Sequence, residues 1–407
     1  MKKIILFSFV FLIALISCSD DGKVSDGNEV IIDSKETTIT SASPLSGKKN
    51  AQITIKGTNL GTNSTDVQVF FGDVNAVVQS VKEDEVVVSV PSMAPDEAIK
   101  VVKGNKEFVA GMFEYIPTVT VSNIRKGQVE LFPNQVAIDK LGNVYFTVNA
   151  TDEVDLISPS GMYSNFVKEL LVGNALAIAT DNSNNVYISD LDGYIWKVMP
   201  SGVKARILND SGNLIRLSGP SGMCFDSKNN LFVTDFNYGR IIKVTPVGVV
   251  SIFVGTDQGF ADGDRKTAKF YQPNGIVSDK QDNLYVADYM NNRIRKITPD
   301  GIVTTLAGSS VRGRTDGTGL NATFDRPRGI TIDKKDNLYI TDYENNTIRR
   351  LSAKGKVTTI AGGSFGFKNG DGDFAEFARP NGIAITPEGI IFVADELNGE
   401  LRKIILE

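Results

Sequence analysis

One pattern recurs six times between about Pro133 and the C-terminus, and it constrains the fold more than any other feature of the chain. The clearest copies read QPNGIVSDKQDNLYVADYMNNRIRKITPDGIVTTLAG from Gln272 and RPRGITIDKKDNLYITDYENNTIRRLSAKGKVTTIAG from Arg326. Each copy holds about four short apolar runs separated by turn residues, which is typical of one blade of a β-propeller. The aromatic residues that mark the phase of the repeat, 42 to 54 residues apart, are Tyr145, Tyr187, Phe232, Tyr285, Tyr339 and Phe392.

The last copy is incomplete, and this predicts how the ring closes. It begins at Arg379, supplies the strands GIAIT, IFVAD and LRKIIL, and ends at Glu407 with no counterpart of VTTLAG. A blade edge left unpaired would be exposed, which folded proteins avoid. The stretch TVTVSNI at 118–124 alternates like a strand and belongs to no blade of its own. We therefore predict an all-β, six-bladed β-propeller over residues 118–407, in which the strand at 118–124 completes the last blade.

The N-terminus resembles that of a bacterial lipoprotein. Lys2 and Lys3 precede an apolar run, Ile4–Ile16, that is too short to span a bilayer but suits a secretory signal. The text LISC that ends at Cys18 resembles a lipobox, whose cysteine is lipidated after cleavage. We expect residues 1–17 to be removed as a signal peptide and Cys18 to carry the lipid. The alternative is an ordinary signal peptide with a chance cysteine.

A polar tether is expected to follow the lipid. Residues 18–36 are rich in Gly, Ser and Asp, as flexible linkers are. Within them, Ser19-Asp20-Asp21 resembles the acidic tag that sends lipoproteins of Bacteroidetes-type bacteria to the outer cell surface. This resemblance implies a lipid-anchored protein of the outer membrane, exposed at the cell surface.

Residues 37–117 form a separate unit with no copy elsewhere in the chain. Short β-branched runs alternate with Gly, Asn and Ser turns, which predicts a small β-sandwich. The order Pro44, Gly47, ITIKGTNLG, VFFG, VVVSVP resembles the IPT/TIG immunoglobulin-like family, with turn glycines at Gly57, Gly61 and Gly72. The resemblance implies a spacer or a binding module, and no reactive group of residues stands out in it.

The propeller copies resemble the NHL-repeat family. The shared features are a PxGI opener, a D-x-x-(D/N)-N turn, a (Y/F)-V-(A/T)-D strand end and an NxRIxKI return. Insertions between blades carry a DG pair, at Asp262-Gly263, at Asp371-Gly372 and, as a variant, at Asp316-Gly317. The first two copies depart from the pattern: Val148 replaces the strand-end aspartate of the first, and neither the PxG opener nor the DG insertion is complete there. The resemblance implies a disc that commonly binds proteins.

Composition excludes several classes of function. Removal of Lys2 and Lys3 would leave 41 of the 43 basic residues against 48 acidic ones, so we expect no nucleic-acid partner, which would need a basic face. Besides Cys18 the only cysteine is Cys224, in the apolar run GMCFD, where we expect a buried small hydrophobe and no disulfide. We expect a monomer and no cofactor.

The chain contains no histidine. Amidating lyases, which bind zinc through histidines, and streptogramin lyases, which use a catalytic histidine, resemble this architecture, but their chemistry is closed to this chain. A Ser-His-Asp arrangement is equally excluded. What remains for an enzyme is a calcium-dependent, lactonase-type site of Glu, Asn and Asp around the central channel, or a two-carboxylate glycosidase. No local motif singles out an acid–base pair.

Strand direction places the candidate binding residues on one rim of the disc. In an up-and-down blade, the loop entering strand one and the loop joining strands two and three share a face. Aromatic faces, amides and guanidinium groups on that rim suit a sugar or peptide ligand through stacking and directional hydrogen bonds. The candidates are Phe236, Asn237, Arg240, Tyr289, Asn292, Arg293, Tyr343 and Asn346.

Structural roles compete with these assignments. Arg240 and Arg293 suit interblade ion pairs as well as a ligand. The text from Asn369 to Asp373 has the alternating oxygens of a calcium loop, but its sixth position is Phe374 and its twelfth is Pro380, so it fails as an EF-hand and we assign no metal ligand. The strand-end aspartates recur in phase and are expected to accept backbone N–H groups in tight loops: Asp190, Asp235, Asp288, Asp342 and Asp395.

Two hypotheses of function follow. The first is a non-catalytic surface lipoprotein whose propeller rim binds an extracellular ligand, with a polysaccharide captured as a nutrient in first place and a surface protein in second. The second is a calcium-dependent hydrolase or lactonase acting at the central channel, which rests on fold analogy alone. The exposed aromatic residues are the strongest site candidates under the first hypothesis.

Overall fold

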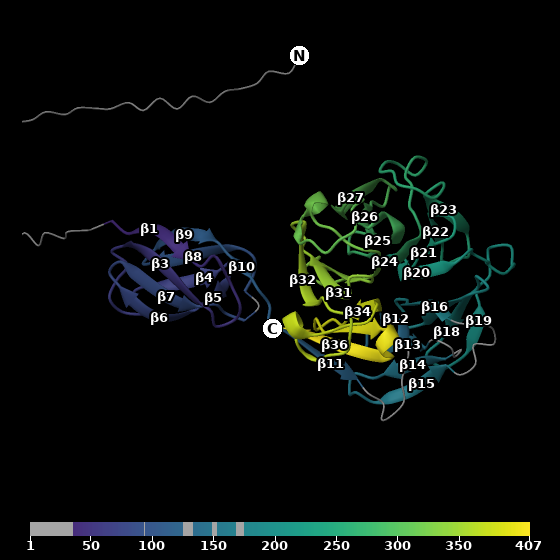
Figure 1. The fold of residues 1–407 in the computed structure, drawn as a ribbon, viewed down its shortest axis with the longest axis horizontal. Helices are drawn as coiled ribbons and strands as arrows, with labels where there is room; N and C mark the ends of the chain where they lie inside the picture. The colour runs from purple at the N-terminus through teal and green to yellow at the C-terminus, as the bar shows by residue number, and fades with distance from the viewer. Residues whose placement is uncertain (1–35, 93, 125–132, 149–152, 168–174) are drawn as a thin grey trace, which may run out of the picture.

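The computed structural model describes residues 36–92, 94–124, 133–148, 153–167 and 175–407. These residues form two all-β bodies, a sandwich of β1–β10 and a ring of β11–β36 (Figure 1). The expected signal peptide at 1–17, Cys18 and nearly all of the expected tether lie outside the described residues. Among the described residues, no helix is long and apolar enough to cross a membrane.

The N-terminal body is a sandwich of two antiparallel sheets, ordered β1-β3-β7-β6 and β5-β4-β8-β9. Buried and exposed residues alternate along its central strands, so that Ile53, Ile55, Val69 and Phe71 meet in one core. Its strands are β1 (Thr38–Ser43), β2 (Ser46–Gly47), β3 (Gln52–Thr58), β4 (Gln68–Phe71), β5 (Val74–Asn75), β6 (Val77–Lys82), β7 (Glu85–Ser89), β8 (Ala98–Lys103), β9 (Lys106–Met112) and β10 (Glu114–Tyr115).

The C-terminal body is a propeller of six blades arranged around a channel (Figure 1). The first blade consists of β12 (Pro133–Ile138), β13 (Val144–Val148), β14 (Val154–Ile157) and β15 (Tyr163–Val167), and the second of β16 (Ala175–Thr180), β17 (Val186–Asp190), β18 (Ile195–Val198) and β19 (Lys204–Arg206). The third consists of β20 (Pro220–Phe225), β21 (Leu231–Asp235), β22 (Arg240–Val244) and β23 (Val250–Val254), and the fourth of β24 (Pro273–Ser278), β25 (Leu284–Asp288), β26 (Arg293–Ile297) and β27 (Val303–Gly308). The fifth consists of β29 (Pro327–Ile332), β30 (Leu338–Asp342), β31 (Thr347–Leu351) and β32 (Lys356–Gly362).

The sixth blade joins the two ends of the propeller. Its strands are β34 (Pro380–Ile385), β35 (Ile391–Asp395), β36 (Glu400–Leu406) and β11 (Val119–Ile124). β11 pairs antiparallel with β36, from Val119 opposite Leu406 to Ile124 opposite Leu401, and Thr118 and Glu407 exchange backbone hydrogen bonds of 2.8 and 2.9 Å. The strand that was expected to close the ring therefore lies at the outer side of β36, which leaves neither strand as a free edge.

Short elements decorate the insertions and loops. The two-residue strands β28 (Gly317–Thr318) and β33 (Gly370–Asp371) pair with β32 and β11. The described residues also form the single-turn 3₁₀ helices η1 (Tyr289–Asn291), η2 (Gly319–Asn321), η3 (Gly372–Phe374) and η4 (Glu396–Asn398).

The first strands of the blades pack unusually closely around the channel, and this explains the glycine of the PxG opener. A Cβ at Gly222 would lie 2.2 Å from the backbone oxygen of Asn274 in the next blade, and one at Gly329 would lie 2.3 Å from that of Asn381. The same oxygen of Asn381 accepts a 2.7 Å hydrogen bond from the Thr341 hydroxyl. Side chains at these glycine positions are therefore excluded by the neighbouring backbone.

The variant Gly329→Ala is expected to lower the free energy of unfolding by about 3 kcal/mol, because the new methyl group must push apart two packed first strands. Gly355→Ala is a matched control, since its turn is open, with no atom within 4 Å of the new Cβ, and only its φ of +84° opposes a side chain. We expect about 1 kcal/mol for the control. Denaturant titration of both variants measures the difference, and equal losses would contradict the close packing.

The repeated aspartates and the insertions are structural. Asp288, Asp342 and Asp395 are buried and accept backbone N–H groups as expected, but from the residue two positions before the opener proline of their own blade rather than from their own loop. The carboxylate of Asp288 also binds Arg295 at 2.6 Å, and burial raises the pKa of Asp288 to about 6 although Arg295 opposes this rise. Arg295 in turn binds Asp262 of the insertion at 2.6 Å.

The insertion of the sixth blade corrects the alignment of the DG pairs. Arg349 binds Asp316 in the way that Arg295 binds Asp262, at 2.9 Å. In the sixth blade, Arg402 donates to the Oδ1 atom of Asn369 at 3.0 Å. The equivalent of Asp262-Gly263 is therefore Asn369-Gly370, and the expected pair Asp371-Gly372 lies two residues too late. Asp371 instead accepts the backbone N–H of Asp373 at 3.2 Å at the start of η3.

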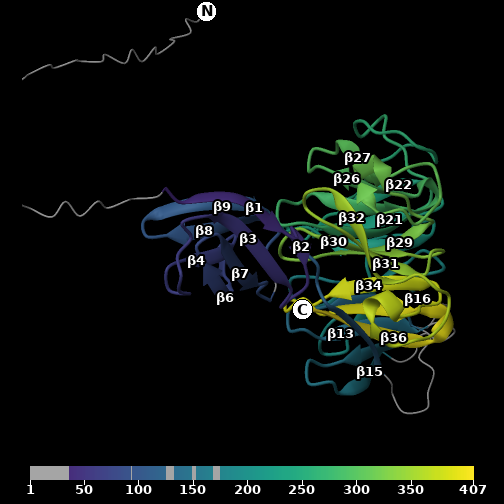
Figure 2. The same cartoon turned by 60° about the vertical axis from the view of Figure 1, so that its left-hand side comes forward.

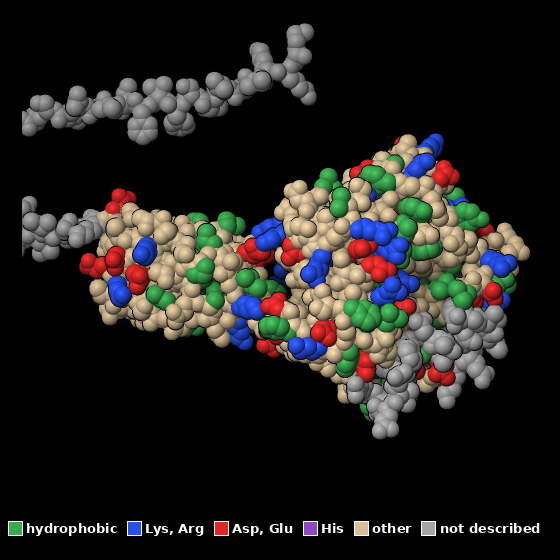
Figure 3. Space-filling model, in the orientation of Figure 1, with side chains coloured by type: hydrophobic (Ala, Val, Ile, Leu, Met, Phe, Trp, Pro, Cys, Tyr) green, Lys and Arg blue, Asp and Glu red, His purple; other side chains and the backbone are tan. Residues whose placement is uncertain are grey.

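The two bodies meet along the fifth blade through charged groups. Lys356 pairs with Glu114, Lys354 donates to the backbone oxygen of Asp96, and Arg350 lies 3.8 Å from the Asp96 carboxylate. Figure 2 shows the sandwich beside the propeller, and Figure 3 shows basic and acidic side chains gathered at the junction. The core clusters of the two bodies share no residue, so the junction is a polar contact rather than a shared core. Ion pairs of this exposed kind stabilise weakly.

Candidate functional site

The side chains of the residues that line the central channel are mostly apolar. The channel encloses a volume of about 190 Å³, lined by the first strands of the blades, with residues such as Ala177, Met223, Ile276 and Ile383. No acidic side chain is among its described lining residues. Among the described residues there is also no group of three or more His, Cys, Asp and Glu side chains placed to hold a metal ion. The polar groups that a ligand needs must therefore come from an end of the channel.

One mouth of the channel carries residues that differ from blade to blade. Two positions of each blade lie at it. One is the second residue of strand one, which is the x of the PxG opener where that motif is complete (the opener position), and the other is the residue after strand two (the loop position). The opener positions are Asn134, Leu176, Ser221, Asn274, Arg328 and Asn381, and the described loop positions are Leu191, Phe236, Tyr289, Tyr343 and Glu396. A repeated frame with unequal side chains can bind an asymmetric ligand.

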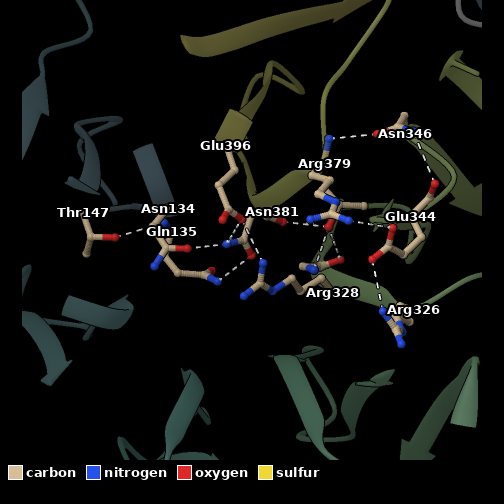
Figure 4. Close-up of polar contacts among 12 residues, drawn as sticks. Asn134, Gln135, Thr147, Arg326, Arg328, Glu344, Asn346, Arg379, Asn381 and Glu396 are labelled. Atoms are coloured by element: carbon tan, nitrogen blue, oxygen red, sulfur yellow. Dashed lines mark hydrogen bonds and ion pairs between the residues drawn. The ribbon is translucent and has the colours of Figure 1, made fainter. Parts of the chain in front are cut away.

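A polar network joins the fifth, sixth and first blades across this mouth (Figure 4). The Arg328 guanidinium and the Glu396 carboxylate are 2.9 Å apart, and the Asn381 amide donates to the same carboxylate at 3.1 Å. Gln135 donates to Asn381 at 3.0 Å, and Asn381 donates to Asn134. Side chains from three blades are thus fixed relative to one another at the mouth.

A second ionic group lies beside it. Glu344 accepts from Arg326 at 3.1 Å and from Arg379 at 3.3 Å (Figure 4). The backbone N–H of Arg379 donates to Asn346, and that of Arg326 donates to Asn292, both at 2.9 Å. The two asparagines, predicted as ligand-binding residues, therefore hold the loop of one blade to the opener of the next.

Aromatic rings continue the mouth along the third to fifth blades. The rings of Phe236 and Tyr289 have centroids 6.2 Å apart. The Arg326 guanidinium lies 5.8 Å from the Tyr289 ring, and Arg328 lies 4.6 Å from the Tyr343 ring. Both Phe236 and Tyr289 are half-buried, so one part of each ring is open to a ligand.

Tyr343 does not have the exposure that was expected of it. Its side chain is only 7% exposed because it lies beneath Arg328 and Arg379, whose guanidinium groups are 4.6 and 5.5 Å from the ring. Burial raises the pKa of its hydroxyl. Tyr343 therefore supports the arginines of the mouth, and the ligand-facing surface of the fifth blade is Arg328.

Three predicted residues make their contacts outside the polar network of the mouth. Arg240 binds Asp235 of its own blade at 2.8 Å, and Arg293 donates to the backbone oxygen of Asn291 at 2.8 Å and lies over Phe260. In the described contacts neither arginine makes the interblade ion pair that was the alternative to a ligand-binding role. Asn237 is exposed and donates to Ser218 at 3.2 Å.

Sequence reasoning missed most of the polar residues of the mouth. Asn134, Gln135, Arg326, Arg328, Glu344, Arg379, Asn381 and Glu396 were not singled out. The available signal was variation inside the repeat: PNG, PRG and PSG share the flanking residues and differ at the opener position.

Other cavities are larger but are built differently. The opposite mouth has a volume of about 480 Å³ and is formed by the D-x-x-(D/N)-N turns. There the carboxylate of Asp279 already accepts Gln281 N, Asn283 N, Asn283 Nδ2 and the Tyr285 hydroxyl, and Asp333 repeats the pattern. The junction of the two bodies holds a cavity of about 430 Å³. At the opposite mouth, the repeated turns are bonded internally and therefore leave few groups free to bind a ligand.

Comparison with known proteins agrees with this architecture. The IPT/TIG domain model matches residues 37–120, and the NHL repeat model matches residues 270–297 and 324–351. The protein SUPPRESSOR OF QUENCHING 1 of Arabidopsis thaliana is 25% identical over 320 residues, which cover 68% of this chain and 30% of that protein. The chain thus spans less than a third of the length of this curated relative.

Solved structures share the fold at low identity. An auxiliary nutrient binding protein of Bacteroides thetaiotaomicron is 18% identical with a TM-score of 0.59, over 92% of this chain and 98% of that one. A streptogramin B lyase is 16% identical with a TM-score of 0.50, over 71% of this chain and 98% of that one. The chain is therefore an IPT/TIG domain followed by a six-bladed β-propeller with NHL repeats.

Proposed function

We propose that this chain is a non-catalytic, lipid-anchored surface protein that captures an extracellular saccharide at the channel mouth. One observation carries the proposal: a regular propeller frame presents unequal aromatic, amide and charged side chains at a single mouth. Aromatic faces stack on sugar rings, while amides and guanidinium groups bond to hydroxyl groups. In this account the IPT/TIG domain is a spacer that holds the disc away from the membrane.

Two further observations support capture rather than chemistry. A protein with the same architecture along its length is described as a nutrient binding protein, which fits a role in uptake. The N-terminal sequence up to Cys18 suits a lipid anchor in the outer membrane. The acidic residues that follow Cys18 suit export of the protein to the cell surface. Both features suit a protein that meets polysaccharide outside the cell.

The experiment that tests the proposal is isothermal titration of residues 19–407 against plant and host polysaccharides, with calcium present. We expect saturable heat with one class of glycan and no new reducing ends after hours of incubation. Silence across the panel would overturn saccharide capture and favour the protein partner. Apolar side chains that stand exposed on loops and insertions, such as Tyr238, Phe260 and Phe365, are where such a partner would bind.

A hydrolase at the central channel would need acidic side chains around the reacting atoms. The described channel lining offers none, and the acidic residues of the described polar network, Glu344 and Glu396, are paired with arginine. We therefore expect a chelator to change neither the saccharide affinity nor the melting temperature. Product release that a chelator abolishes would replace the binding proposal with an enzyme.

A further inference from the structure

The channel mouth is divided into zones of different chemistry. Leu176 and Leu191 make the second blade apolar, Phe236 and Tyr289 make the third and fourth aromatic, and the fifth, sixth and first blades are polar and charged. We propose, on the basis of the proposed function, that the captured ligand is an acidic saccharide. Its sugar ring lies on Phe236 and Tyr289, and its anionic group lies against Arg328.

The placement of Arg328 suits recognition of an anion. Its guanidinium is held between the Tyr343 ring, at 4.6 Å, and the Glu396 carboxylate, at 2.9 Å. Only one of its nitrogen atoms, Nη1, is engaged by Glu396, and no described residue accepts from the other two, which are not buried. With its side chain 26% exposed at an opener position, Arg328 presents a fixed edge of donors to the mouth. A guanidinium edge binds a carboxylate or sulfate through paired hydrogen bonds.

The balance of charge at the mouth points the same way. In the two ionic groups of the mouth, three arginines, Arg326, Arg328 and Arg379, face two glutamates, Glu344 and Glu396, which leaves one positive charge in excess. The neighbouring carboxylate of Asp325 is paired with Arg312 at 3.7 Å, so it does not change this balance. The chain as a whole has a formal net charge of −5. The mouth is therefore a local reversal of sign on an acidic protein, and it attracts the anionic group of a ligand while the surrounding surface repels it.

An unused acceptor lies on the neighbouring first strand. Asn274, at the opener position of β24, is 5% exposed, and its Oδ1 atom accepts no hydrogen bond from the described residues. The first strands β24 and β29 are in direct contact, as the 2.5 Å approach of a Cβ at Gly275 to the Arg328 backbone oxygen shows. If this amide turned toward the mouth, its oxygen atom would accept a hydrogen bond from a hydroxyl of the same sugar, beside the donors of Arg328.

The test compares ligands that differ only in charge. Acidic polysaccharides and their carboxyl-reduced or desulfated forms are titrated against residues 19–407. We expect the acidic form to bind at least tenfold more tightly, with an affinity that falls as salt rises, and the neutral form to show little salt dependence. Equal or tighter binding of the neutral form overturns this inference and leaves saccharide capture intact. Failure of every member of the panel to bind overturns the capture itself.

Variants keep the test independent of folding. Arg328→Gln alone would leave the Glu396 carboxylate without its positive counter-charge. The double variant Arg328→Gln/Glu396→Gln is therefore used, because it replaces the ion pair by two neutral amides. We expect it to lose the preference, so that the acidic and the neutral form bind with equal affinity, whereas Arg328→Lys retains part of the preference. An unchanged preference in the double variant, at an unchanged melting temperature, overturns the role of Arg328.

Discussion

Tyr289→Ala is expected to weaken saccharide binding about thirtyfold, which corresponds to about 2 kcal/mol for an aromatic residue at the centre of a contact. The Tyr289 ring is half-buried, with Phe236 on one side at 6.2 Å and Arg326 at 5.8 Å. Its removal takes away the surface on which a sugar ring stacks and frees the two neighbours that it positions. Titration of the variant against the glycan bound by the native chain measures the loss.

Tyr238→Ala is the matched control for this prediction. Tyr238 lies two residues after Phe236, is 54% exposed, stacks on the Arg240 guanidinium at 4.6 Å and takes no part in the described contacts of the mouth. Its loss should leave the affinity unchanged within about twofold, since exposed substitutions of this kind are close to neutral. Equal effects of the two substitutions would remove the mouth as the binding surface.

Arg295→Met is expected to lower the free energy of unfolding by about 3–5 kcal/mol, the largest stability effect that we predict. Arg295 is fully buried and binds the carboxylates of Asp288 and Asp262, each at 2.6 Å. It also donates to the backbone oxygens of Ala261 and Lys269, at 2.7 and 3.1 Å. The methionine fills part of the space but leaves the buried carboxylate of Asp288 without its counter-charge.

The pH dependence of this loss has a definite sign. Burial already raises the pKa of Asp288 from its ordinary value of 3.8 to about 6, and Arg295 is the strongest influence that opposes the rise. In the variant the pKa rises further, so the folded state prefers the protonated acid, and stability falls as pH rises through the folded pKa. The deficit relative to the native chain should be smaller at pH 5 than at pH 8. A deficit independent of pH would contradict the ionic account.

Arg293→Met controls for the loss of an arginine from the same strand. Arg293 is half-buried, and its contacts are a 2.8 Å hydrogen bond to the Asn291 backbone oxygen and the Phe260 ring. We expect a loss of about 1 kcal/mol. Urea titrations of both variants at the two pH values give the comparison, and matching losses would show that the buried ion pairs add nothing.

The fold could be predicted because the sequence features that determine it are local and recur in each blade. The phase aromatics and openers recur, so the number of blades followed from counting, and the missing last strand of the sixth blade pointed to 118–124. The register of the insertions was less accessible. The prediction aligned the insertion of the sixth blade by its DG pair at Asp371. The alignment is set instead by Arg402, which donates to Asn369, a contact between residues far apart in sequence.

The site was predicted only in outline. Counting strands placed Phe236 and Tyr289 on one rim, and the structure brings them together. The exposure of Tyr343 was predicted wrongly because burial there depends on Arg328 and Arg379, two long side chains from two blades. Arg328 and Glu396 lie 68 residues apart, and nothing in the sequence of either blade pairs them. Contacts between side chains of neighbouring blades depend on how the blades pack together, which no local pattern encodes.

The measurement that tests the central claim most directly is a crystal structure of residues 19–407 with the tightest glycan of the panel. We predict a sugar ring against Phe236 and Tyr289, with its anionic group within hydrogen-bond distance of Arg328. Ligand bound instead at the opposite mouth beside Asp279 and Asp333, or in the junction cavity beside Tyr115, would contradict the assignment of the channel mouth as the site.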